Sequence, residues 1–191
     1  MKHNTGKRLM TIGLLLLAAA FGLTGYNIWD ENRAEQEAAA VVNQLPQPVE
    51  GEGYVLHPDM EMPAMEIDGR RYIGRLTVPA IGLDLPVLEE WSNSNGKVAP
   101  CRYEGSVYTD DLIIAGHNYR SHFGGLKNLG VGEQVLFTDA DGNVFSYAVA
   151  VLEILDGTAV EEMEAGEWDL TLFTCTYGGQ TRLTLRCTEH G

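Results

Sequence analysis

Three side chains in the second half of the chain are of the types that nucleophilic catalysis requires. Cys175 ends an apolar run and precedes a Tyr-Gly-Gly turn, so its thiol would be both rigidly placed and exposed. His117 ends a second apolar run, and histidine can both donate and accept a proton near neutral pH. Arg182 follows Cys175 by seven positions, so a hairpin would return its guanidinium to the thiol, where a fixed positive charge can stabilise an oxyanion. The set predicts nucleophilic catalysis through a thiol.

Each of these residues also has a plainer interpretation. A lone cysteine in a strand is most often a buried apolar side chain, a lone histidine is most often a satisfied loop residue, and an arginine that opens a strand is most often solvated. Arg186 lies on the same face of a strand as Arg182, and His122 follows His117 by five residues, so they are the alternative guanidinium and imidazole. The joint occurrence of all three types favours the catalytic interpretation.

Short strands must position these side chains, because from Tyr72 onward short apolar runs alternate with turn residues. This pattern is typical of a closed all-β barrel or a sandwich. A short helix is expected over residues 121–129, where apolar residues recur on one face. Asp-Gly at 141–142 predicts a hairpin rather than a calcium loop, since the closing glutamate of such a loop is missing. The expected strands are 73–78, 81–87, 112–115, 135–137, 144–152, 170–175 and 182–187.

The N-terminal part of the chain has the composition of a membrane span. Residues 9–28 form a run of 20 residues without a charge, which is long enough for a helix to cross the hydrocarbon core of a bilayer. Three basic residues precede the run and acidic residues follow it from Asp30, so the positive-inside rule places the N-terminus in the cytoplasm. A cleaved signal peptide is the alternative, but Ala18 and Ala20 lie too deep in the run for a cleavage site. We therefore expect an uncleaved anchor.

Charge and proline content divide the rest of the chain. The 13 Lys and Arg residues against 27 Asp and Glu give a net charge of −14, which argues against a nucleic-acid binder, since such a protein needs a basic face. Residues 31–44 could continue the helix as a stalk until Pro46 and Pro48 end it, and residues 51–69 have the composition of a linker or a loosely docked arm. We expect a cytoplasmic tip (1–8), a transmembrane signal anchor (9–29), a stalk and linker (30–71) and a catalytic domain (72–191).

Four segments of the chain resemble the sortase family, in the family's order. Residues 171–175, Thr-Leu-Phe-Thr-Cys, match the TLxTC signature, and residues 114–118, Ile-Ala-Gly-His-Asn, resemble the strand that ends in Gly-His. Residues 182–185 resemble the Arg-led strand that follows the active-site cysteine. Residues 73–87 resemble the opening of the domain, IGxLxIPxI…LPV. The similarity extends from about Tyr72 to about Cys187.

The resemblance implies a mainly β fold, an eight-stranded sortase-type β-barrel with short helices, preceded by one N-terminal transmembrane helix. It also implies a membrane-anchored cysteine transpeptidase. Cys175 would attack a backbone carbonyl in the C-terminal sorting signal of a secreted protein, and His117 would protonate the leaving amine and then deprotonate the incoming one. Arg182 would hold the oxyanion and the signal backbone, and Thr174 would shape the substrate groove. An amine on a cell-wall precursor or a pilin would resolve the thioester, at a Gram-positive-type surface and without a cofactor.

Several choices stay open at this point. The same residues would serve a membrane-anchored cysteine hydrolase that uses water as the acceptor, whereas a non-catalytic extracellular binding domain would not need them. The tight Cys175–Arg182 interval, together with residues 99–103, favours a class B-like sortase. Because the outer face of a cell is oxidising, Cys101 and Cys187 are a candidate disulfide, with two separate thiols as the favoured alternative. The cysteines and histidines lack the spacing of a zinc site.

Overall fold

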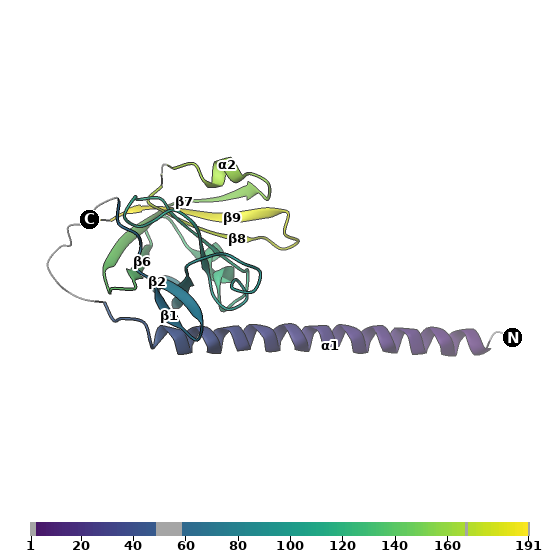
Figure 1. Ribbon diagram of the computed structural model, residues 1–191. Helices are drawn as coiled ribbons and strands as arrows, with labels where there is room; N and C mark the ends of the chain where they lie inside the picture. The colour runs from purple at the N-terminus through teal and green to yellow at the C-terminus, as the bar shows by residue number, and fades with distance from the viewer. Residues whose placement is uncertain (1–2, 49–58, 167, 191) are drawn as a thin grey trace. The chain divides into compact units, whose positions relative to one another are not determined.

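The computed structural model describes residues 3–48, 59–166 and 168–190, and the chain forms two compact units, residues 1–33 and 34–191 (Figure 1). The described helical elements are α1 (His3–Val42), α2 (Val160–Met163) and two 3-10 turns, Pro79–Ile81 and Phe123–Asn128. The described strands are β1 (Met65–Ile67), β2 (Arg70–Val78), β3 (Leu83–Leu88), β4 (Cys101–Glu104), β5 (Leu112–Gly116), β6 (Gln134–Asp139), β7 (Val144–Asp156), β8 (Leu170–Cys175) and β9 (Thr181–Glu189).

Helix α1 contains both the expected span and the helical part of the expected stalk. Its segment Gly6–Val42 is long and apolar enough to cross a membrane, and the leucines at 14–17 are exposed within the first unit. In the second unit, the last two turns of α1 bury Ala38 and Val41. The helix ends at Val42, just before the Leu45-Pro46 pair that the sequence predicts as its end.

Eight strands close a β-barrel in the order β2-β3-β4-β5-β8-β9-β7-β6, with β6 pairing back to β2. The pairs β3–β4 and β5–β8 are parallel, and the other pairs are antiparallel. This confirms the predicted eight-stranded barrel. A ninth described strand, β1, lies at the edge of the sheet and pairs with the first three residues of β2.

The barrel closes at Gly74, the first residue of β2 that pairs with β6. Strand β2 is irregular between Tyr72 and Gly74, where its register with β3 shifts, as happens at a β-bulge. A Cβ atom at Gly74 would lie 2.1 Å from the backbone carbonyl oxygen of Thr138 on β6. Glycine is therefore required for the two strands to approach closely enough to pair.

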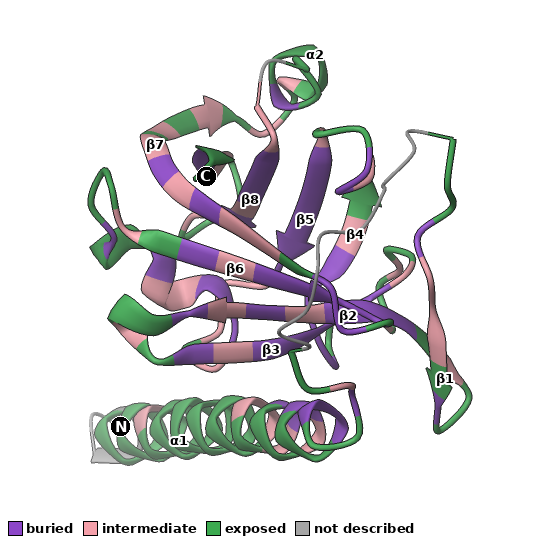
Figure 2. Cartoon of the chain, turned by 90° about the vertical axis from the view of Figure 1, so that its left-hand side faces the viewer, coloured by how far each residue is buried: buried purple, intermediate pink, exposed green. Residues whose placement is uncertain are grey.

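The parallel pair β5–β8 lies at the centre of the apolar core. Every residue of β5 is buried (Figure 2), as are Leu170 and Leu172 of β8. Strands buried on both faces have continuous apolar runs rather than an alternating pattern, which is why residues 112–115 and 170–175 are the clearest strand signals in the sequence. This rigid centre carries the residues that the sequence singled out for chemistry.

The structure differs from the sequence-based expectations mainly in elements that are short. Strand β4 and helix α2 are not among the elements expected from the sequence. The predicted arm at 51–69 contains β1, while its residues 51–58 lie outside the described residues. The helix expected over 121–129 is a 3-10 turn, Phe123–Asn128. None of these elements is long enough to show a clear hydrophobic period.

The predicted hairpin at Asp141-Gly142 is confirmed, since it joins β6 to β7. The carboxylate of Asp139, at the start of the segment that resembles a calcium loop, is buried and hydrogen-bonded within the protein. Its Oδ1 accepts the backbone N–H groups of Asp141 and Asn143, each at 2.9 Å, and its Oδ2 accepts the Tyr108 hydroxyl at 2.8 Å. Burial, followed by this hydrogen bond, raises the pKa of Tyr108. The carboxylate therefore fixes the hairpin to the core.

Candidate active site

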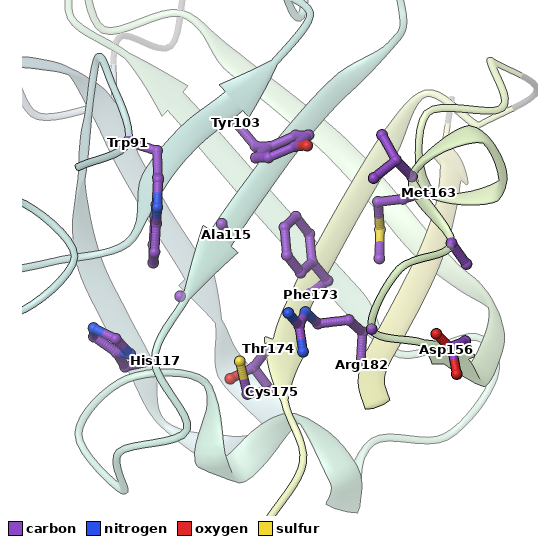
Figure 3. Close-up of a pocket in the computed structure, with 14 residues that line it drawn as sticks. Trp91, Tyr103, Ala115, His117, Asp156, Met163, Phe173, Thr174, Cys175 and Arg182 are labelled. Atoms are coloured by element: carbon purple, nitrogen blue, oxygen red, sulfur yellow. The ribbon is translucent and has the colours of Figure 1, made fainter. Parts of the chain in front are cut away.

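The parallel pairing of β5 with β8 brings His117 and Cys175 to neighbouring strand ends. Gly116, the last residue of β5, pairs with Thr174 of β8, and His117 and Cys175 are the residues that follow. Both side chains are partly exposed, and both line the same pocket (Figure 3). Two segments separated by 58 positions in the sequence (175 − 117) thus deliver an imidazole and a thiol to one site.

The β8–β9 hairpin places Arg182 directly opposite Cys175. Thr176 and Thr181 close the turn, with the Thr176 N–H donating to the Thr181 carbonyl at 3.0 Å and the two hydroxyls 2.6 Å apart. Arg182 Nη1 donates to the Gly179 carbonyl oxygen at 2.9 Å, which holds the guanidinium beside the turn. Figure 3 shows it on the opposite side of Cys175 from His117. The predicted hairpin geometry is therefore present.

Cys175, His117 and Arg182 line a pocket of about 210 Å³ whose remaining lining is largely apolar. The rings of Tyr103 and Phe173 meet edge to face, with centroids 5.4 Å apart, a favourable arrangement for aromatic pairs. An apolar cavity with a few convergent polar groups is typical of a binding site for an organic ligand. The rest of the apolar lining includes Trp91, Ala115, Ala159, Val160 and Met163.

Two aromatic side chains hold the imidazole of His117. Tyr119 stacks on it with ring centroids 5.0 Å apart, and Trp91 meets it edge-on at 5.7 Å. Gly96 lies against the Trp91 ring and the His117 imidazole, because a Cβ there would be 2.8 Å from the Trp91 ring and 3.4 Å from His117 Nε2. Sequence reasoning missed these aromatic residues, since they lie in connections without periodicity and only the folded chain brings them to the imidazole.

The alternative guanidinium and imidazole lie outside the pocket lining. Arg186 is buried and bound to Glu153 of β7. His122 is 1% exposed. Burial, and then the charge of nearby His117, lowers the pKa of His122 to about 4. His122 is therefore neutral and out of reach at neutral pH, which favours His117 as the imidazole that faces a substrate.

The depressed pKa of His122 predicts a loss of stability in acid. Unfolded histidine titrates near 6.5, so the unfolded chain binds a proton there while the folded chain does not until about pH 4. The stability that the folded state gains from a neutral His122 is complete above pH 6.5. The free energy of unfolding should fall by about 2 kcal/mol between pH 6.5 and 5. His122→Phe should remove this part of the slope in denaturant titrations. The exposed His190→Ala variant is the control, and a His122→Phe slope equal to wild type would contradict the assignment.

The three cysteines are free thiols, so the candidate Cys101–Cys187 disulfide is not formed. Cys101 is buried among the residues that contact the end of α1, whereas Cys187 is buried in the main barrel core. Burial raises the pKa of each of these two thiols to about 12, which makes them poor nucleophiles. Cys175 is the cysteine that combines partial exposure with a place in the pocket.

Within the described segments, no group of three or more His, Cys, Asp or Glu side chains could hold a metal ion. Asp156 also lines the pocket, but its carboxylate accepts hydrogen bonds from a residue of its own turn. Its Oδ1 accepts the hydroxyl and the backbone N–H of Thr158, at 2.6 and 2.9 Å. These bonds, and the charge of Arg182, keep the pKa of Asp156 below its usual value.

A barrel that carries a cysteine at one strand end, with arginine opposite it and histidine at the neighbouring strand end, is suited to thiol-based chemistry. The sortase domain model matches residues 76–190, which is more than half of the chain, and the protein therefore belongs to the sortase family. It is a cysteine transpeptidase in the general sense of that family. The resemblance seen in the sequence is confirmed, and the class B-like assignment stays a prediction.

The sequence relative and the similar solved structures agree with membership of the sortase family. Sortase A of Bacillus anthracis is 26% identical over 183 residues, which cover 86% of this chain and 85% of that relative. The crystal structure of sortase C1 from Streptococcus agalactiae matches with a TM-score of 0.57 at 24% identity, over 66% of this chain and 71% of the other. A sortase D5 transpeptidase from Clostridium perfringens matches with a TM-score of 0.55 at 18% identity, over 63% and 79%. The two structural matches establish the likeness of the fold.

Proposed function

We propose that the protein cleaves a C-terminal sorting signal through a thioester on Cys175 and transfers the upstream polypeptide to an amine. The thiolate of Cys175 adds to the scissile carbonyl carbon, and Arg182 stabilises the oxyanion that forms. When the C–N bond breaks, His117 gives a proton to the leaving amine. An incoming amine then attacks the thioester, His117 accepts its proton, and the new amide bond releases the thiolate.

The observation that carries this proposal is the pairing at the strand ends. Cys175 is directly opposite Arg182 across the β8–β9 hairpin, and the pairing of Gly116 with Thr174 supports a site in which His117 and Cys175 end neighbouring strands. Rigid strands hold catalytic groups more accurately than loops do. Thr174 supports the assignment of a substrate groove, because the residue lines the pocket and its buried hydroxyl has no hydrogen-bond partner among the residues that the structure describes.

The proposed donors are secreted proteins that carry a C-terminal sorting signal, and the proposed acceptors are amines of a cell-wall precursor or a pilin. The anchor (9–29) would hold the catalytic domain (72–191) outside the membrane on the stalk and linker (30–71), with the tip (1–8) in the cytoplasm. Basic residues before the span and acidic residues after it support this orientation. Tethering raises the effective concentration of enzyme and substrate at one membrane face.

The test is an assay of the full chain in detergent micelles with LPxTG-like and NPxTN-like peptides and an amine, either glycine or a diaminopimelate-type compound. We expect a joined peptide–amine product in the mass spectrum. We also expect a Cys175-linked acyl adduct when the amine is omitted. Cleavage without joining, at every amine concentration, would replace the transpeptidase with the hydrolase. A folded protein that forms no adduct with any peptide would favour a binding domain.

A further inference from the structure

Arg186 on β9 is a buried charge whose hydrogen bonds reach several elements of the barrel. It is 2% exposed, and its guanidinium donates four hydrogen bonds. Nε binds Glu153 Oε1 of β7 at 2.9 Å, and Nη1 binds the hydroxyl of Thr171 on β8 at 3.1 Å. The other two bonds reach the backbone carbonyls of Met163, from Nη1 at 2.9 Å, and of Glu162, from Nη2. One side chain thus joins β7, β8 and β9 to the helix α2.

Helix α2 depends on this connection for its position. It has four residues, Val160–Met163, and a single turn is not stable by itself, because helix nucleation is unfavourable. The carbonyls at the end of a helix lack partners within the helix, and those of Glu162 and Met163 are the ones that Arg186 binds. A buried cation at that end also suits the sign of the peptide dipoles. Arg186 therefore acts as a C-terminal cap that belongs to the barrel.

The same turn forms one wall of the pocket. Val160 and Met163 both line it, and Figure 3 shows Met163 beside Phe173 at the end away from His117. Met163 is 5% exposed, and its sulfur lies 4.0 Å from the hydroxyl of Thr184. A loss of the bonds to Arg186 would release the wall but leave the pairing of Cys175 with Arg182 in place.

We infer that Arg186 is a positioning residue that holds the α2 wall and thereby sets the affinity for the apolar part of the donor peptide. This inference rests on the proposed function for its kinetic consequence. It also assigns a physical role to Thr171, the first residue of the Thr-Leu-Phe-Thr-Cys segment, since its hydroxyl accepts a bond from Arg186. Arg186 acts through α2 and does not touch the reacting atoms.

The test compares Arg186→Lys with wild type in the full chain. Lysine keeps the charge but lacks the planar fork that serves four acceptors at once. We expect KM for the donor peptide to rise about tenfold and kcat to change less than about threefold. Alkylation of Cys175 by iodoacetamide should keep its wild-type rate. Hydrogen exchange at the amides of Met163 and Glu164, which close the α2 turn, should accelerate, while exchange in β5 should not.

Met163→Ala removes the wall side chain and keeps the bonds to Arg186, so it is the partner for a double-mutant cycle. The double variant should raise KM by less than the product of the two single effects. A wild-type KM with unchanged exchange at α2, or a fall in kcat without a rise in KM, would overturn the inference. If Arg186→Lys does not fold, Thr171→Val removes one of the four bonds and should produce smaller shifts in the same direction.

The exchange measurement separates this inference from the proposed function, because it needs no substrate. If wild type forms no adduct with any peptide, the proposed function fails, while faster exchange at α2 in Arg186→Lys still supports the positioning role. Conversely, normal transfer by wild type with unchanged α2 exchange in the variant rejects the positioning role alone.

Discussion

Replacement of Cys175 by alanine is expected to abolish transfer, lowering kcat by at least about 10⁴-fold. Removal of the thiol removes the covalent route, and a pocket that still binds the peptide cannot form an acyl intermediate. The Kd for the peptide, measured by direct binding, should change little, since the apolar lining is intact. The measurement is mass spectrometry of products and of the acylated protein, with and without the amine.

Cys101→Ala is the matched control for this experiment. It also removes one cysteine, but Cys101 is a buried thiol that does not itself line the pocket, so transfer should continue at close to the wild-type rate. Residual transfer above about a hundredth of wild type in Cys175→Ala, or loss of transfer in a folded Cys101→Ala protein, would show that another residue carries the acyl group.

Arg182→Ala is expected to lower kcat by about 10²–10³-fold, the range for loss of one oxyanion-stabilising group. Arg182→Lys should restore only part of this loss, because the ammonium keeps the charge but cannot reproduce the fork. The rate of Cys175 alkylation by iodoacetamide should fall less than about tenfold in both variants, since that reaction forms no oxyanion. Steady-state kinetics and the alkylation rate together separate the two contributions.

The matched control is Arg71→Ala, which removes an arginine whose exposed side chain pairs with Glu89. Such pairs contribute little to stability, so activity and folding should both be retained. Equal losses of transfer and of alkylation in Arg182→Ala would assign the arginine to thiol activation instead of oxyanion binding. Full activity in Arg182→Ala would remove it from the site.

The sequence was sufficient where a local pattern decides the structure. The buried pair β5–β8 appears as two apolar runs, and the residues that end these runs, His117 and Cys175, occupy the same pocket. The hairpin that brings Arg182 back follows from the short glycine-containing turn. The apolar runs and the hairpin depend on neighbours in the chain and could be predicted from the local sequence. The eight-stranded barrel was implied by the family resemblance, because the pairing of β5 with β8 is long-range.

The rest of the pocket could not be predicted, because long-range packing decides it. Trp91 comes from the β3–β4 connection, Tyr103 from strand β4 and Met163 from helix α2, and the three reach the pocket only in the folded barrel. The burial of His122 likewise depends on contacts that a single sequence does not display. For Arg186 the sequence indicated the correct face of the strand, but not that α2 covers it.

Strand β9 is the last strand in chain order, yet it lies between β7 and β8 in the sheet. During synthesis, a chain that has not yet reached Thr181 has two sheet edges without their final partner and lacks Arg182. Unpaired strand edges of this kind are open to association with other chains. The thiol is thus made before the strand that completes its surroundings. A nascent or C-terminally clipped molecule would carry Cys175 without a finished barrel, and the onset of activity would coincide with insertion of β9.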